Sequence, residues 1–212
     1  MTRAVAGLQA EDMAWIRVRD KALGRRLTVI EECRFPSSAR QRFLFGHPGL
    51  SDAAVAIVED GARQWFRLTA RHPGAQLAMP SVAVNDLWHE LVLQTQEYAQ
   101  FCEDAFGRFL HYTPRDPQGP QLLETLRMAR QDERCGDDQL PLLFRVDRET
   151  GVAGGRVYLA DCGGRGECFP LAGLTCLHHA EGVERRTRRP WRFEKQVPPD
   201  SGTGGWEFCG GG

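Results

Sequence analysis

Apolar residues recur at helical spacing along most of the first 150 positions. Between 51 and 72, Ser51 is a suitable N-cap and Pro73 ends the pattern. Similar spacing predicts further helices at 1–33, 121–133 and 140–151. The RFPSS stretch at 34–38 predicts a break, after which a short apolar piece leads to Ser51. The pattern therefore predicts a mainly α-helical domain over about 1–150.

The clearest pattern runs from Met79 to Pro114 and predicts one long amphipathic helix. Ser81 is its expected N-cap, and Gly107 stands near its end. At about 100° per residue, one wide arc holds Val84, Leu87, Trp88, Leu91, Val92, Thr95, Tyr98, Ala99, Cys102, Ala105 and Phe106. We expect this helix to be central to a core that includes Trp65, Phe66, Trp88, Leu91, Tyr98 and Phe106.

The opposite arc of this helix carries the candidate chemistry. Asp86 and His89 are three residues apart, so they share a face, and His111 follows the helix. An Asp beside a His can orient the imidazole, which suggests a metal site or an acid/base group. The alternative is a polar surface pair that packs against a neighbour. The metalloprotease pattern H-E-x-x-H is not met, because Leu93 stands where its second His belongs.

The character of the chain changes after Gly151. Glycine becomes frequent, and GRVYLADC at 155–162 is the clear strand-like run. Residues 180–212 are rich in Arg, Pro and Gly, which predicts an irregular tail. We therefore expect residues 151–212 to form a small irregular α+β, Gly/Cys/Arg-rich extension with a mobile tail.

Composition narrows the location and the partners. The net charge of −1 gives no global attraction to nucleic acid or acidic lipid. No apolar run approaches 18 residues, and the N-terminal residues lack the apolar stretch of a signal peptide. We expect a cytoplasmic protein with no membrane partner.

The seven cysteines include a loop cluster that resembles a set of metal ligands. Without a secretory signal, a disulfide framework is not expected. The candidate ligands are Cys162, Cys168, Cys176 and His178, with His179 beside them. Their spacings, C-x5-C and C-x7-C, differ from zinc knuckles, so the alternative is a loop with ordinary buried thiols. Zinc is the candidate cofactor.

A basic, aromatic stretch at 184–195 is the candidate nucleic-acid surface. Its residues are Arg185, Arg186, Arg188, Arg189, Trp191 and Arg192. Arginines with interleaved aromatics can bind phosphates and stack on bases. The same composition suits a solvated tail that docks on an acidic protein surface.

The segment 79–114 resembles the glycine-rich domain-containing protein-like family of plants and bacteria. The matching residues are Asp86, Trp88, His89, Leu93, Thr95, Tyr98, Phe101, Cys102, Phe106, Gly107, His111 and Pro114. The resemblance implies a helical domain followed by a glycine-rich tail, of which the ending Cys209–Gly212 is a shortened form. Many relatives carry a second His where this chain has Leu91, so a metal site implied by the family lacks one ligand here.

These observations favour a non-enzymatic role. No phosphate-binding loop, dinucleotide fingerprint or G-x-S-x-G elbow occurs in the sequence. We expect a cytoplasmic binding or scaffold module, stabilised by zinc, whose partner is another protein. The alternatives are a hydrolase-like, metal-dependent enzyme that uses Asp86, His89 and His111, and an RNA-binding protein that uses the basic stretch at 184–195.

Overall fold

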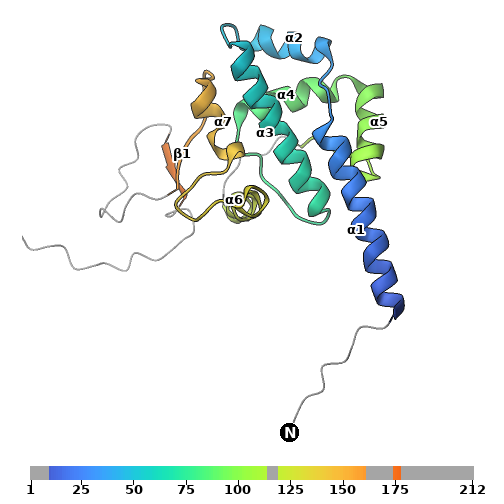
Figure 1. Cartoon of the computed structure of the whole chain (residues 1–212). Coiled ribbons are helices and arrows are strands. Elements are labelled where there is room, and N and C mark those ends of the chain that lie inside the picture. Colours follow the sequence, from blue (N-terminus) through green and yellow to red (C-terminus); the bar gives the residue numbers. More distant parts are fainter. Residues whose placement is uncertain (1–9, 114–118, 161–173, 178–212) are drawn as a thin grey trace, which may run out of the picture. The chain divides into compact units, whose positions relative to one another are not determined.

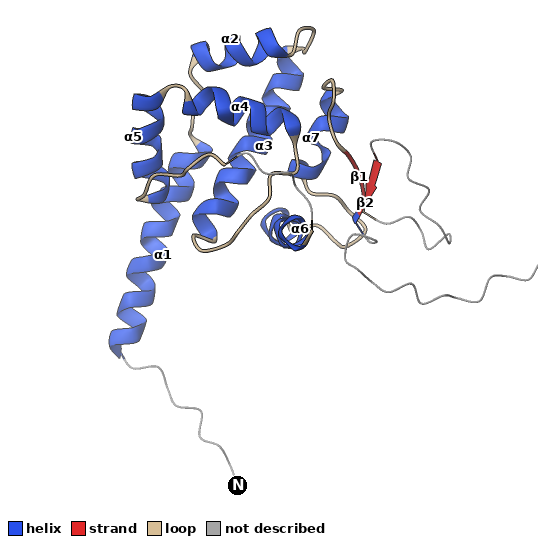
Figure 2. Cartoon of the chain, turned by 180° about the vertical axis from the view of Figure 1, so that it is seen from behind, coloured by secondary structure: helices blue, strands red, loops and turns tan. Residues whose placement is uncertain are grey.

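The chain is mainly α-helical, as its sequence predicts. The computed structural model describes residues 10–113, 119–160 and 174–177. Its helices are α1 (Ala10–Glu31), α2 (Ser37–Gly46), α3 (Asp52–Arg71), α4 (Val82–Val92), α5 (Thr95–Phe106), α6 (Pro120–Glu133) and α7 (Leu142–Thr150). Figures 1 and 2 show them from opposite sides. Within these ranges, no helix is both long enough and apolar enough to cross a bilayer.

Helix α3 is the centre of the packing, because it contacts α1, α4, α5, α6 and α7 (Figure 1). The predicted cap is confirmed: the Ser51 hydroxyl accepts a hydrogen bond from Ala54 N at 3.2 Å. Gly61 allows α4 and α7 to approach α3 closely. A Cβ atom at Gly61 would lie 2.7 Å from Val146 and 2.9 Å from Val84.

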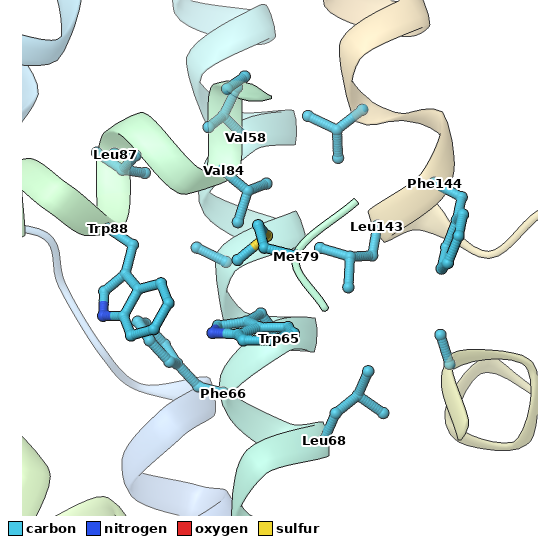
Figure 3. Packing of buried hydrophobic residues seen from close by; sticks show 14 of the residues in the cluster. Val58, Trp65, Phe66, Leu68, Met79, Val84, Leu87, Trp88, Leu143 and Phe144 are labelled. Atoms are coloured by element: carbon cyan, nitrogen blue, oxygen red, sulfur yellow. The ribbon is translucent and has the colours of Figure 1, made fainter. Parts of the chain in front are cut away.

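The predicted core is confirmed. Six aromatic or aliphatic side chains assigned to it from the sequence are all buried: Trp65, Phe66, Trp88, Leu91, Tyr98 and Phe106. Figure 3 shows Trp65, Phe66 and Trp88 side by side between α3 and α4. The ring centroids of Trp65 and Trp88 are 5.7 Å apart. This aromatic group is the side of the core on which the candidate site is built.

The prediction of one continuous helix from 79 to 114 is wrong, because the segment contains two helices. Gln94 has ψ 65°, outside the helical region, and its N–H donates to Leu91 O at 3.0 Å. Helix α5 then runs in a new direction (Figure 1). A single helical wheel places Thr95 and Ala99 in the core, whereas both are exposed.

Helix α2 begins at the end of the predicted break at 34–38 and includes the short apolar piece that follows it, where no helix was predicted. Pro36 is the residue before the helix and has φ −55° and ψ 140°, a conformation that proline favours. Only Ala39 and Phe43 of α2 are buried. Two buried side chains and the partly buried Leu44 in ten residues give a periodicity too sparse to recognise in the sequence.

The strand predicted at 155–162 is confirmed as the short β1 (Val157–Leu159). Its parallel partner, β2 (Leu174–Cys176), was not anticipated. Arg156 N donates to an Asp147 carboxylate oxygen at 2.8 Å, and the Tyr158 hydroxyl donates to Pro80 O at 3.0 Å. The described residues at 152–160 therefore pack against the helical part of the chain. The predicted mobile tail lies outside the described residues.

Candidate functional site

A chain of hydrogen bonds joins α4, α5 and the segment 107–113. The Trp88 indole N–H donates to the Tyr98 hydroxyl at 3.1 Å, and that hydroxyl donates to Leu110 O at 2.6 Å. Leu110 N donates to the Cys102 sulfur at 3.5 Å. Burial raises the pKa of both the Tyr98 phenol and the Cys102 thiol, so both stay protonated. These contacts hold the segment 107–113 against α5 and, through Tyr98, next to Trp88 of α4.

The two ends of the segment 107–113 are also fixed. Gly107 ends α5 in the left-handed region at φ 65°, and its N–H donates to Glu103 O at 2.9 Å. At the other end, the Asn85 side-chain amide donates to the Tyr112 hydroxyl at 2.9 Å. The segment therefore turns back toward α4.

A pocket of about 290 Å³ lies between this segment, α4, the end of α3 and the loop 72–79. Much of its wall is apolar, from Trp65, Ala75, Leu77, Met79, Trp88 and Leu110. Such a volume is at the lower end of the range for small-molecule sites. The pocket therefore suits a compact molecule with an apolar face.

Among the residues that the structure describes, the polar part of the pocket wall has no carboxylate. His72, Arg108 and His111 line it, and no described Asp or Glu does. Arg108 and Pro73 are exposed, and an Arg108 Nη atom donates to Pro73 O at 3.3 Å. The guanidinium group therefore connects two exposed parts of the pocket wall.

The His72 imidazole is neutral at neutral pH. Burial is the largest cause that lowers its pKa below the usual value, and nearby Arg127 and Arg71 lower it further. Glu124 and Asp132 act in the opposite direction but do not reverse the shift. The charges around this side of the pocket therefore disfavour an additional cation.

Trp65 lines the pocket and carries an unpaired donor. The residue is 5% exposed, and its indole nitrogen is buried with no hydrogen-bond acceptor in the described part of the chain. Figure 3 shows this nitrogen on the side of the ring that faces Trp88. The Trp88 ring offers only a weak N–H···π contact. A buried donor without an acceptor costs roughly 1–3 kcal/mol.

A larger hollow of about 700 Å³ runs along α6, but Arg127 and Arg130 in its wall are already engaged. Arg127 forms an ion pair with Glu124 at 2.6 Å. Arg130 donates to the backbone carbonyls of Gln139, at 3.2 Å, and Asp137. No buried polar atom among the residues lining this hollow is without a partner. We therefore take the smaller pocket as the candidate site.

The sequence-predicted site residues lie in different surroundings. The Asp86 carboxylate pairs with His47 Nε2 at 3.0 Å, a contact between α4 and the residue after α2. His89 lies 3.5 Å from the Glu90 carboxylate, and its ring centroid is 5.5 Å from that of Tyr112. His111 lines the pocket, whereas Asp86 and His89 do not.

The predicted zinc ligands lie mostly outside the described residues. Of Cys162, Cys168, Cys176 and His178, only Cys176 is described, and it is buried in β2. Among the described residues, no three His, Cys, Asp or Glu side chains come together as a metal site. The arginines predicted to bind nucleic acid, at 185–192, also lie outside the described ranges.

Residues 25–176 match the UCP032817-like family, and this match covers more than half of the chain. The chain belongs to the UCP032817-like family. The matched region of this UCP032817-like chain begins within α1 and ends with β2, so it includes every residue that lines the candidate pocket. Comparisons with curated proteins and with solved structures gave no match.

Sequence reasoning missed most of the pocket. Trp65 was assigned to the core alone, and nothing pointed to His72 or Arg108. These residues lie at the end of α3 and after α5, and the packing of α3 against α4 and α5 brings them together. The sequence did hold one local signal for His72 and Arg108, because each follows the end of an amphipathic helix. Polar residues at such a position stand at the edge of the buried face of the helix.

Proposed function

We propose that this protein is a binding module that holds a compact organic molecule in the pocket beside Trp65. The unpaired Trp65 indole N–H is the observation that carries the proposal. The indole nitrogen is buried, so a ligand oxygen would accept this hydrogen bond after the Trp65 ring shifts toward the pocket, and the bond would remove the cost of the unpaired donor. The proposal narrows the binding or scaffold role predicted from the sequence to a small-molecule site.

The composition of the pocket wall supports this proposal. Two indole rings and several aliphatic side chains provide an apolar surface, and polar side chains form the rest of the wall. Small-molecule sites commonly combine these two features, because apolar contact contributes affinity and the polar groups fix the orientation. The frame around Tyr98 keeps the wall in place without a ligand, which lowers the entropic cost of binding.

The resemblance of 79–114 to the glycine-rich domain-containing protein-like family fits the same proposal. Trp88 and His111 of its motif line the pocket, and Tyr98, Cys102 and Gly107 hold the segment that closes one side. The motif thus supplies part of a binding site in addition to core packing. A hydrolase-like use of Asp86, His89 and His111 gains no support from the geometry, because Asp86 and His89 lie outside this pocket.

The proposal is tested by ligand-observed NMR with two probes, benzamide and benzoate. We expect saturation transfer from the protein to at least one probe. Ala75 lines the pocket, so Ala75→Phe should fill it and abolish the transfer. Ala56→Phe places the same side chain at an exposed position of α3 and should preserve the transfer. Absence of transfer to both probes, or equal transfer with Ala75→Phe, overturns the proposal.

A further inference from the structure

We infer that the ligand of this pocket is an organic carboxylate, and that Arg108 selects it over neutral molecules of the same shape. This inference rests on the proposed function, because it names the chemical class that the proposed site accepts. It specifies the charge of the ligand, which cannot be deduced from the apolar wall or from the Trp65 donor.

The distribution of charge in the pocket wall favours an anion. Arg108 is a permanent cation, and the described part of the wall contains no carboxylate that would neutralise it or repel a negative ligand. His72 and His111 can each donate a hydrogen bond from a ring nitrogen. The ionisable side chains in the described part of the wall are therefore neutral or positive, and Glu124 and Asp132, which act on His72, do not line the pocket.

Arg108 has donors to spare. One of its nitrogens donates to Pro73 O, and the guanidinium group forms no ion pair within the described ranges. A guanidinium group has five N–H donors in a planar arrangement that matches the two oxygens of a carboxylate. The contact with Pro73 holds the side chain along the pocket, so little side-chain freedom remains to be lost on binding.

The shape of the pocket favours a carboxylate that is attached to an apolar group. Arg108 is exposed, whereas Trp65 and Trp88 are buried. An anion beside Arg108 therefore stays near water, and the rest of the molecule can contact the indole rings. This arrangement avoids the high cost of burying a charge fully in an apolar environment. Inorganic phosphate lacks the apolar part and should bind much more weakly.

His72 offers a second way to observe the charge of a bound ligand. Its pKa is lowered by burial, by Arg127 and by Arg71, while Glu124 and Asp132 oppose the shift. A carboxylate in the pocket would compensate the nearby positive charges and raise the pKa of the imidazole. Benzamide carries no charge and should leave this pKa nearly unchanged.

Benzoate and benzamide have nearly the same shape and differ in charge, so their dissociation constants measure the selection directly. We expect benzoate to bind at least about tenfold more tightly, the factor that one charge-assisted hydrogen bond supplies. Arg108→Gln should weaken benzoate about tenfold and leave benzamide unchanged, which also shows that the variant folds. Arg108→Lys should retain part of the preference.

Arg25→Gln is the matched control, since it removes one positive charge from an exposed position of α1. It should change neither dissociation constant. Equal affinity for the two probes, or an equal effect of Arg25→Gln and Arg108→Gln on benzoate, overturns the inference and leaves the proposed function standing. Failure of both probes to bind overturns both.

Discussion

The Ser81 hydroxyl donates a 2.6 Å hydrogen bond to the buried carboxylate of Asp147, which lies 66 residues later in the chain. The same carboxylate accepts the N–H groups of Val82, at 2.8 Å, and Ala83, at 3.1 Å. These N–H groups begin α4, so an acidic residue of α7 caps α4. Its negative charge also interacts favourably with the positive end of the α4 dipole. The first turn of α4, and with it the Asn85 and Trp88 side of the pocket, depends on this contact.

Replacement of this carboxylate should destabilise the fold strongly. Asp147→Asn removes the negative charge and places an amide NH2 group among several donors. We expect the free energy of unfolding, from urea denaturation, to fall by about 3 kcal/mol or more. Asp20→Asn makes the same change at an exposed position of α1 and should have almost no effect. Equal stabilities of the two variants would contradict the capping role.

Removal of the Tyr98 hydroxyl should loosen the pocket frame. Tyr98→Phe leaves the Trp88 N–H and the Leu110 carbonyl without their partner. We expect a loss of about 2–4 kcal/mol in the free energy of unfolding and faster amide exchange at Leu110. Tyr112→Phe removes a hydroxyl from a partly exposed residue and should cost less than about 1 kcal/mol. A smaller loss for Tyr98→Phe than for Tyr112→Phe would be inconsistent with the frame.

The same substitution at two helical glycines should have opposite effects. Gly61→Ala forces a methyl group against Val146 and Val84, so we expect a loss of about 1–3 kcal/mol in stability. Gly24 lies in α1 with open space around it, and Gly24→Ala should raise stability by about 0.5–1 kcal/mol. Thermal denaturation of both variants provides the comparison. A stabilising Gly61→Ala would show that the helices can separate at little cost.

The low pKa of His72 predicts a pH-dependent loss of stability. The unfolded chain binds a proton at His72 near the usual pKa of about 6.5, whereas the folded chain resists it. As the pH falls from about 6.5 to the folded pKa, the unfolded state takes up more protons, so the free energy of unfolding decreases. An NMR titration of the His72 ring checks the direction. A folded pKa at or above 6.5 would be contrary to this account.

Features with a local origin could be predicted from the sequence, and contacts between distant segments could not. Ser51 and Ser81 could be recognised as N-caps from the sequence, because a cap contact spans only three residues. In the structure each hydroxyl accepts a hydrogen bond from the N–H three residues ahead. The buried faces of α3 and α4 followed from their periodicity. The break at Gln94 was missed, because the apolar pattern continues across it while the backbone turns.

The candidate site shows the same division. The sequence selected Asp86 and placed His89 beside it, whereas the partner of Asp86 is His47, 39 residues earlier. Their pairing requires α2 to pack against α4, and α2 itself was missed. His111 was selected for its place after the helix, and the structure places it in the pocket. Its neighbours Trp65 and His72 come from α3 and the residue that follows it, which no local pattern connects to His111.

The Trp65 indole N–H resonance tests the central claim most directly, because Trp65 lines the proposed site. In a ¹H–¹⁵N spectrum it is assigned by its absence in Trp65→Phe. We predict that it moves progressively as benzoate is added and reaches a plateau when the site is saturated, and that Ala75→Phe abolishes the movement. A Trp65 resonance that stays in place while benzoate saturates the protein would contradict the account.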